Sequence, residues 1–491
     1  MIRFDSVGKS YPDGTEAVRD FTLELPSGRT TVLVGSSGCG KTTLLRMVNR
    51  MVDPTTGSVW IDDDNVADIP PVPLRRRIGY VMQNAGLLPH RKVIDNIATV
   101  PLLNGVSKTD AHRRALELME LVGLETTMAN RYPDQLSGGQ QQRVGVARGL
   151  AADPNILLMD EPFGAVDPLV RADLQTELLR IQRELHKTIV FVTHDIAEAL
   201  ALGDQIVILA KAPGSPRPER PSRWWPNPPT SSLPTSSVSA AAPSTCTCAR
   251  PRGAPWWSTV MAVPPVGSPT RRRGRSTDMT WVLANLELIG SRTVSHLLLA
   301  VPAIVLSFVL ALPLGWFAAN HRWSRATLLT AAGLLYAIPS LPLFVVLPTI
   351  LGIGVRDAAN VIIALTLYGL ALMVRAAADA LSSVGAPVRL SSTALGYSPA
   401  SRFWQVELPL AGPVLLAGLR VVAVSTISLV TVSSLLGVDN LGLLFVDGFQ
   451  RGILAEVLTG IVATVVLAVL VDGLLVLLGR LLMPWARGSR A

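Results

Sequence analysis

The chain has 491 residues, of which 49% are hydrophobic and only 5% are aromatic, and its formal net charge is +8. A single core rarely grows beyond about 300 residues, so this length predicts several domains, and the composition predicts a soluble part joined to a membrane part. The charge does not indicate nucleic-acid binding. Residues 211–278 hold ten Lys and Arg against Glu219 and Asp278, so the whole excess lies in one segment of biased composition.

Residues 1–210 alternate strand-like runs with longer amphipathic stretches. The strand-like runs are 30–35, 155–159 and 188–193, and the clearest amphipathic stretches are 110–122 and 170–185. Strands that alternate with helices predict an α/β domain with a mainly parallel sheet.

The segment GSSGCGKTT follows the first of these strands and fits the phosphate-binding pattern G-x-x-x-x-G-K-[ST]. Its glycines let the backbone curl so that N–H groups face the phosphates of ATP. Lys41 adds a positive charge, and the Thr42 hydroxyl can ligate Mg²⁺. The predicted ATP-binding residues of this loop are Gly35, Ser36, Ser37, Gly38, Cys39, Gly40, Lys41, Thr42 and Thr43.

The segment ILLMDEP, residues 156–162, is a buried strand that ends in two carboxylates. A carboxylate at a strand end beside the phosphates can hold Mg²⁺ through water, which is the role predicted for Asp160. We expect Glu161 to polarise the attacking water.

The segment LSGGQQQRVGVARGL, residues 136–150, contains a serine and two glycines at a predicted helix start, a second anion-binding N-terminus. One nucleotide rarely needs two phosphate cradles about 100 residues apart in one chain, but two copies facing head to tail would use both. With these motifs, residues 1–210 resemble the ATPases of ABC transporters. The resemblance implies that Ser137, Gly138, Gly139 and Gln140 bind ATP in trans, across a dimer of ATPases.

The same resemblance implies further roles, residue by residue. Tyr11 should stack on adenine, and Gln83 should contact both Mg²⁺ and the membrane partner. His194 should contact the γ-phosphate, and Asp167 should act in trans; Val166 stands where the family usually has Leu. The expected catalytic residues are therefore Glu161, His194 and Gln83, and the expected Mg²⁺ ligands are Thr42, Gln83 and Asp160.

Residues 279–491 predict an all-α polytopic membrane domain with about five transmembrane helices. The stretch Trp281–Gly290 is too short to cross, and we expect it to lie in the interface. The predicted spans are 297–319, 326–350, 358–376, 412–437 and 457–479; Arg420 interrupts the fourth and Asp472 the fifth.

The segment ALGYSPASRFWQVELPLAGPVLLAGLR, residues 394–420, resembles the coupling loop of binding-protein-dependent importer permeases. The resemblance implies that the loop forms short helices that dock on the ATPase beside Gln83. Its matching residues are Gly396, Val406, Leu408 and Pro409, where Gly396 allows a sharp turn and Pro409 is expected to end the second helix. The family's Glu-Ala-Ala start is replaced by Leu390–Ser392.

A coupling loop must face the cytoplasm, and five spans then leave Met279 outside the cell while the ATPase lies inside. Residues 211–278 contain 14 prolines and no apolar run long enough to cross between the two sides. The simplest account is two adjacent genes joined by a frameshift, with 211–278 read out of frame. A genuine fusion with a sixth span is the alternative.

Overall, the motifs resemble the importers of osmoprotectant quaternary amines such as glycine betaine, carnitine or choline. The resemblance implies an ATP-binding domain at 1–210, a linker at 211–278 that is disordered or out of frame, and a permease domain at 279–491. It implies a multi-pass protein of the bacterial cell membrane with a cytoplasmic ATPase, second copies of ATPase and permease, and a separate substrate-binding protein. Two alternatives stay open: a methionine or other amino-acid importer, and an inactive fused product of a frameshifted locus.

Overall fold

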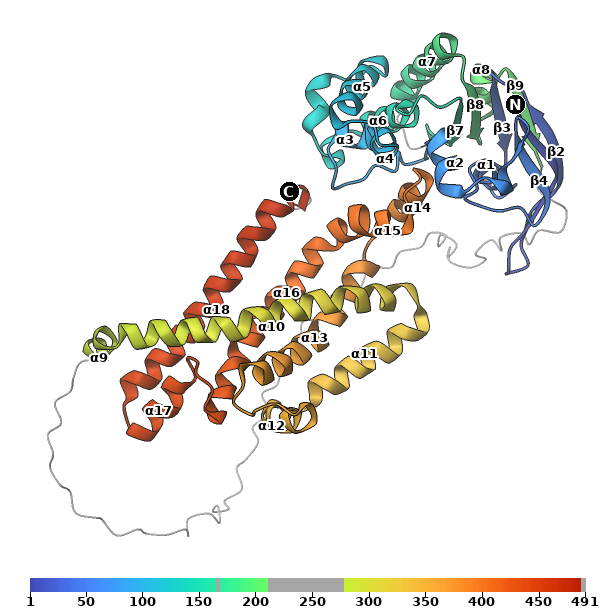
Figure 1. Cartoon of the computed structure of the whole chain (residues 1–491). Coiled ribbons are helices and arrows are strands. Elements are labelled where there is room, and N and C mark those ends of the chain that lie inside the picture. Colours follow the sequence, from blue (N-terminus) through green and yellow to red (C-terminus); the bar gives the residue numbers. More distant parts are fainter. Residues whose placement is uncertain (165–167, 211–277, 487–491) are drawn as a thin grey trace, which may run out of the picture. The chain divides into compact units, whose positions relative to one another are not determined.

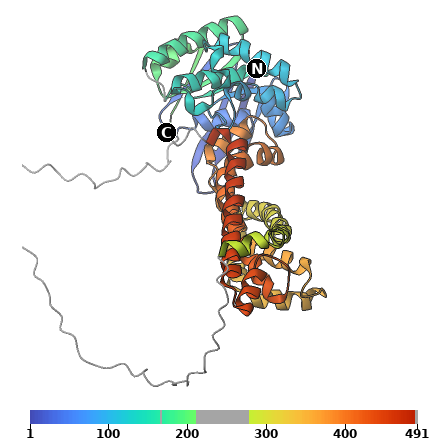
Figure 2. The same cartoon turned by 90° about the vertical axis from the view of Figure 1, so that its left-hand side faces the viewer.

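The computed structural model describes residues 1–164, 168–210 and 278–486. Asp167 and Val166 therefore lie outside the described residues, as does the tract 211–277. Figure 1 and Figure 2 show the described part from two directions.

Two sheets build the N-terminal domain, and the larger one confirms the predicted parallel arrangement. It contains β6(Ile78–Val81), β7(Ile156–Asp160), β8(Thr188–Thr193), β3(Thr30–Gly35) and β9(Gln205–Leu209), in that order and all parallel. An antiparallel sheet that we did not predict lies beside it, in the order β2(Glu16–Leu25), β1(Ile2–Ser10), β4(Thr56–Ile61) and β5(Asp64–Asn65).

Helices cover the parallel sheet on both faces, which explains why its strands are continuous apolar runs. Along β3, Val32 and Val34 join one hydrophobic core while Leu33 joins the other, as the two-residue period of a strand requires. The helices and 3₁₀ turns are α1(Lys41–Val48), η1(Val66–Asp68), α2(Pro71–Arg77), α3(Val93–Ile97), α4(Thr99–Leu103), α5(Lys108–Leu121), η2(Thr126–Asn130), η3(Pro133–Gln135), α6(Gly138–Leu150), α7(Pro168–Leu185) and α8(Ile196–Leu202).

The C-terminal domain is entirely helical, as predicted. Within the described residues, four helices are long and apolar enough to cross a membrane: Leu286–Asn320, Ala358–Ser382, Pro399–Leu436 and Leu454–Leu482. The elements are α9(Asp278–Ala284), α10(Leu286–Asn320), α11(Arg322–Ala337), α12(Ser340–Leu351), α13(Ala358–Ser382), α14(Ala386–Ala394), α15(Pro399–Arg402), the π-helical turn η4(Phe403–Glu407), α16(Leu408–Val430), η5(Thr431–Leu436), α17(Leu443–Arg451) and α18(Leu454–Leu482).

The prediction of one continuous span at 326–350 is wrong. The chain forms two helices there, Arg325–Ala337 and Ser340–Leu351, which are bent by 103°. The break falls at Ile338, whose φ of −66° and ψ of 126° are extended. Pro339 follows it, and a proline pushes the preceding residue out of the helical region.

The bent pair nevertheless runs the whole length of α13. Arg325 Nη2 lies 2.8 Å from Asp379 Oδ1, near the C-terminal end of α13. Asn360 Nδ2, near its N-terminal end, donates to the carbonyl oxygen of Phe344 at 3.0 Å. By length and composition the pair counts as a fifth candidate crossing. Ser307 of α10 donates to the carbonyl oxygen of Thr366 and Gly315 lies beside Ala377, so α10 begins at the end of the helix bundle opposite to the C-terminal end of α13.

Candidate functional site

The predicted catalytic residues follow neighbouring strands of the parallel sheet. Gly35 ends β3, Asp160 ends β7 and Thr193 ends β8, while Gln83 lies two residues beyond β6. Because parallel strands end at the same edge, the order β6-β7-β8-β3 brings these segments together. Residues that are far apart in the sequence thus share one site.

The phosphate-binding loop has the backbone shape that its glycines allow. Gly38 and Gly40 have φ of +80° and +95°, a region that residues with a Cβ rarely adopt. The buried Lys41 Nζ donates to the carbonyl oxygens of Gly35 and Ser36, at 2.8 and 2.9 Å. α1 begins at Lys41, so the loop lies at a helix N-terminus, where backbone N–H groups and the helix dipole favour an anion.

Asp160 is buried beside this loop. Thr42 Oγ1 donates to Asp160 Oδ1 at 2.8 Å, and the Tyr80 hydroxyl lies 3.3 Å from Asp160 Oδ2. Burial, and then the nearby Asp160 carboxylate, raises the pKa of Tyr80 above its ordinary value, so this phenol stays protonated and donates. Within the described residues no three His, Cys, Asp or Glu side chains gather as a metal site. A hydroxyl and a single carboxylate nevertheless suit Mg²⁺, which takes most of its ligands from phosphates and water.

Glu161 is the meeting point of the predicted catalytic residues. Gln83 Nε2 donates to Glu161 Oε2 at 3.2 Å, and His194 Nδ1 lies 3.2 Å from the same oxygen. The backbone of Glu161 has a φ of +45°, uncommon for a residue with a side chain. Its N–H is held by the carbonyl oxygen of Val192 in β8 at 3.0 Å. The site therefore groups one carboxylate with an amide and an imidazole.

The other predicted nucleotide contacts lie on exposed surface. Tyr11 occupies the turn between β1 and β2 and is 36% exposed. A Cβ on Gly40 would lie 2.5 Å from the carbonyl oxygen of Ala17 in β2, so this hairpin borders the phosphate loop. Ser137 caps α6: its hydroxyl accepts from the Gln140 N–H at 3.3 Å, while Gln140 Oε1 accepts from the Ser137 N–H at 3.0 Å. The start of this helix, including Gly138, faces outward.

The predicted coupling segment contacts the N-terminal domain near Gln83. Gly396 turns with a φ of +81°, and its carbonyl oxygen accepts from Arg76 Nε at 3.0 Å. A Cβ on Gly396 would lie 2.6 Å from Arg76 Cγ and 3.0 Å from the Val72 carbonyl oxygen. Ser391 donates to the carbonyl oxygen of Gly86, so a residue that replaces the family's Glu-Ala-Ala start still makes contact.

An apolar cluster completes this contact. Val406 is fully buried and packs with Leu88 and Val100 of the N-terminal domain and with Leu395 and Tyr397. Leu408 contributes instead to the core of the membrane domain.

The expectation that Pro409 ends a helix is wrong. Pro409 lies in the first turn of α16, and the helix runs on to Leu436. A proline fits this position because its fixed φ of about −65° is already that of a helix.

Comparison with known proteins agrees with the description of both the N-terminal and the C-terminal domain. The ABC transporter family model matches residues 18–164, and the model for the binding-protein-dependent transport system inner membrane component matches residues 311–484. The glycine betaine uptake system ATP-binding protein YehX of Escherichia coli (strain K12) is 51% identical over 209 residues, which cover 43% of this chain and 68% of that protein. The chain belongs to the ABC transporter family.

Two further relatives are transport ATP-binding proteins. The choline transport ATP-binding protein OpuBA of Bacillus subtilis (strain 168) is 49% identical over 209 residues, which cover 43% of this chain and 55% of the relative. The carnitine transport ATP-binding protein OpuCA of Listeria monocytogenes is 50% identical over 209 residues, covering 43% and 53%. The chain thus spans about half the length of these two relatives. With its apolar helices, this ABC transporter is a multi-pass membrane protein.

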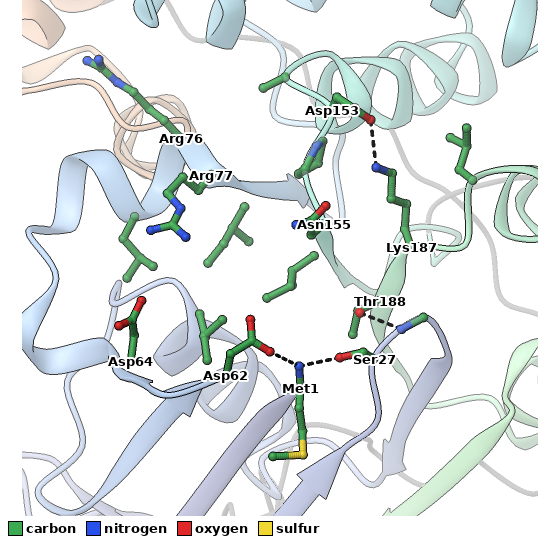
Figure 3. A pocket seen from close by; sticks show the side chains of 18 of the residues that line it. Met1, Ser27, Asp62, Asp64, Arg76, Arg77, Asp153, Asn155, Lys187 and Thr188 are labelled. Carbon is green, nitrogen blue, oxygen red and sulfur yellow. Dashed lines mark hydrogen bonds and ion pairs between the residues drawn. The ribbon is translucent and has the colours of Figure 1, made fainter.

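A separate cavity of about 510 Å³ lies at the other edge of the parallel sheet, at the starts of β6, β7 and β8. Figure 3 shows two ion pairs among the residues that line it. Lys187 Nζ binds Asp153 Oδ1 at 2.8 Å, and the Met1 amino group binds Asp62 Oδ1 at 2.6 Å. This cavity is distinct from the nucleotide site of the ABC transporter, which lies where the strands end.

Sequence reasoning missed residues on the ATPase side of the coupling contact. His90 Nε2 lies 2.8 Å from the carbonyl oxygen of Gln405, and Arg91 Nη2 donates to Gln405 Oε1 at 3.2 Å. The His90 ring also packs edge-on against Trp485, with 6.0 Å between ring centroids. The sequence did offer one signal for His90 and Arg91. They lie a few residues beyond Gln83, which was already expected to face the permease.

Proposed function

We propose that this chain uses ATP hydrolysis to import a small quaternary amine, such as glycine betaine, carnitine or choline, across the bacterial cell membrane. The convergence of Gln83 and His194 on Glu161 is the observation that carries the ATPase assignment. The similarity to choline, carnitine and glycine betaine transport proteins supports the substrate class. The relatives do not favour the alternative of an amino-acid importer.

In the proposed reaction Glu161 accepts a proton from the attacking water. Lys41 and the N–H groups of its loop hold the β- and γ-phosphates, and His194 contacts the γ-phosphate. Thr42, Asp160 and Gln83 would hold Mg²⁺, which neutralises charge on the phosphate oxygens. The Lys41 side chain donates hydrogen bonds to the carbonyl oxygens of Gly35 and Ser36 in its own loop. We expect its Nζ atom to turn towards the phosphates when ATP binds.

We infer that the working ATPase is a head-to-tail dimer. The outward-facing start of α6 supports this arrangement, because Ser137 and Gly138 are free to meet a nucleotide held by a second copy. Resemblance alone assigns Asp167 to the same shared site. It also assigns Tyr11 to stacking on the adenine of ATP.

The permease would bind the ATPase through the loop containing Gly396 and Val406, with the ATPase in the cytoplasm. A separate binding protein would deliver the substrate, and cation–π contacts from aromatic rings suit a quaternary amine there. In proteoliposomes with that binding protein and internal ATP, we expect uptake of labelled glycine betaine, carnitine or choline. Uptake of methionine alone, or uptake without ATP, would contradict the proposal.

A second proposal concerns the domain boundaries and the tract 211–278. We propose that two adjacent genes are joined by a frameshift and that 211–278 is read out of frame. The orientation of α10 supports it, because this helix begins at the end opposite to the coupling loop, where a cytoplasmic ATPase could not reach without another crossing. Residues 1–210 with their proper downstream frame, co-expressed with 279–491 as a separate chain, should reconstitute transport. Recovery from native cells of one intact 52.4 kDa chain with active uptake would overturn this account.

A further inference from the structure

Arg148 is a buried arginine that takes no part in the reaction proposed above. It lies near the C-terminal end of α6, and its residue surface is 1% exposed. Burial lowers the pKa of its guanidinium to about 10, so the group still carries its charge at neutral pH. A buried cation is costly unless other groups accept its hydrogen bonds. The groups that accept from Arg148 therefore indicate what this residue does.

The acceptors are two consecutive carbonyl oxygens of the segment that follows Gln83. Arg148 Nη2 donates to the carbonyl oxygen of Ala85, and Nη1 donates to that of Gly86 at 2.7 Å. Because the donors of a guanidinium are fixed in one plane, two such bonds set the direction of the segment as well as its position. Ala85 and Gly86 have φ of +53° and +58°, so Arg148 holds a sharp turn of the backbone.

A second side chain of α6 holds the other end of this segment. Gln142 is 2% exposed, and its Nε2 atom donates to the carbonyl oxygen of Met82 at 3.2 Å. The helix also packs closely against the turn, since a Cβ on Gly145 would lie 3.4 Å from the Cα atom of Ala85. Gln83 lies between Met82 and Ala85, so α6 holds the chain on both sides of it.

The two ends of α6 face different parts of the transporter. Ser137 caps the outward-facing end, which is assigned to the ATP of a second copy. Arg148 stands eleven residues further on, about 16 Å along the helix axis. The Gly86 carbonyl oxygen that it binds also accepts from Ser391 of α14, and a carbonyl oxygen has lone pairs for two donors. One carbonyl group thus joins α6 to the coupling segment.

We propose that Arg148 is a positioning residue that makes the segment 84–86 follow α6 when ATP of a second copy binds at Ser137. Through this segment the movement reaches Gln83 at the catalytic carboxylate and Ser391 at the permease. Gln142 supports the same link at Met82. The inference deepens the proposed function, because it takes the head-to-tail dimer from it.

Amide hydrogen exchange tests this link without a transported solute. Full-length chains in detergent are compared with and without a non-hydrolysable ATP analogue and Mg²⁺, and exchange is followed in peptides covering 84–91 and 137–140. In the wild type the analogue should slow exchange in both peptides. In Arg148→Lys the slowing at 137–140 should persist. The slowing at 84–91 should shrink on the order of fivefold, as for one lost hydrogen bond, because an ammonium cannot reproduce the two-point contact.

A second variant and a matched control make the result specific. Arg148→Met fills a similar volume without a donor and should abolish the response at 84–91. Arg143→Lys lies on the same helix, but the wild-type Arg143 Nη1 donates to the carbonyl oxygen of Val122 at 2.8 Å. Both responses should remain at their wild-type size in this control.

Three outcomes would contradict the inference. A full response at 84–91 in Arg148→Met would show that α6 moves the segment by another route. Loss of both responses in Arg148→Lys would assign Arg148 a purely structural role in α6. An absent response at 137–140 in the wild type would refute the dimer, and the inference with it, while the import assay would still judge the transported substrate by itself.

Discussion

The Nε2 atom of His90 lies 2.8 Å from the carbonyl oxygen of Gln405, across the contact between ATPase and coupling loop. A carbonyl only accepts, so Nε2 carries the proton. Pro409 stands four residues after Gln405 and has no N–H, so it cannot make the α-helical hydrogen bond to that oxygen. The proline that sequence reasoning assigned to a helix end thus lacks the N–H that would compete with His90 for this carbonyl.

Restoring the missing N–H should weaken the coupling contact. In Pro409→Ala the new N–H competes with His90 for the Gln405 carbonyl. A net hydrogen bond is worth about 1 kcal/mol, so we expect uptake per ATP hydrolysed to fall on the order of fivefold. Pro413→Ala, another proline inside α16, is the matched control and should leave this ratio unchanged. Equal effects of both substitutions would show that general helix stiffness, rather than the freed carbonyl, matters.

Acid should destabilise the chain through His90. Burial, and then the neighbouring Arg91, lowers the pKa of His90 from its usual 6.5 to about 4, while the Gln405 carbonyl partly opposes the shift. Between these values the unfolded chain binds a proton that the folded chain does not. The stabilisation is therefore complete above about pH 6.5 and is lost as the pH falls towards 4.

Thermal unfolding of the full chain in detergent, measured from pH 7.5 down to 4.5, checks this dependence. In His90→Gln the melting temperature should fall less steeply over the acid range than in the wild type. His112→Gln, which alters a histidine bound to Asp95 instead of the permease, should keep the wild-type slope. A His90→Gln profile parallel to the wild type would remove His90 as the cause.

Glu161→Gln should abolish ATP turnover while ATP still binds. The amide cannot take a proton from water, and the loss of a general base costs about 10²–10⁴-fold in rate. Hydrolysis is measured by phosphate release and binding by a fluorescent ATP analogue, and we expect ATP to hold the ATPase dimer closed. Glu184→Gln is the control, since that carboxylate is exposed and pairs with Arg180 on α7. Undiminished turnover in Glu161→Gln would exclude the assigned role.

A side chain at Gly396 should separate hydrolysis from transport. Gly396→Trp must displace Arg76 and the α2 backbone, so we expect uptake to fall at least tenfold while the basal ATPase rate stays near the wild type. Deletion of Ser398–Trp404 should act in the same way. At Gly385, a Cβ would meet only the Pro387 Cδ at an ordinary 3.5 Å, so Gly385→Ala is the matched control. ATP-driven uptake that survives the deletion would show that coupling runs through another contact.

Local pattern by itself determined the α/β character of residues 1–210, the phosphate loop, the carboxylates Asp160 and Glu161, and most of the membrane helices. These features depend on residues that are neighbours in the chain: an apolar run, a glycine spacing, a capping serine. The convergence on Glu161 required the strand order β6-β7-β8-β3. This order brings together Gln83 and His194, which follow β6 and β8 and are 111 residues apart in the chain.

Tertiary structure alone decided the remaining relationships. Hydropathy summed over 326–350 could not reveal the bend at Ile338, because a proline breaks a helix without lowering the apolar content of the window. Arg420 and Asp472 read separately as interruptions of two spans, and only the packing of α16 against α18 makes them a pair. His90 and Gln405 are 315 residues apart. No periodicity connects such residues, because their contact depends on how completed helices and strands pack.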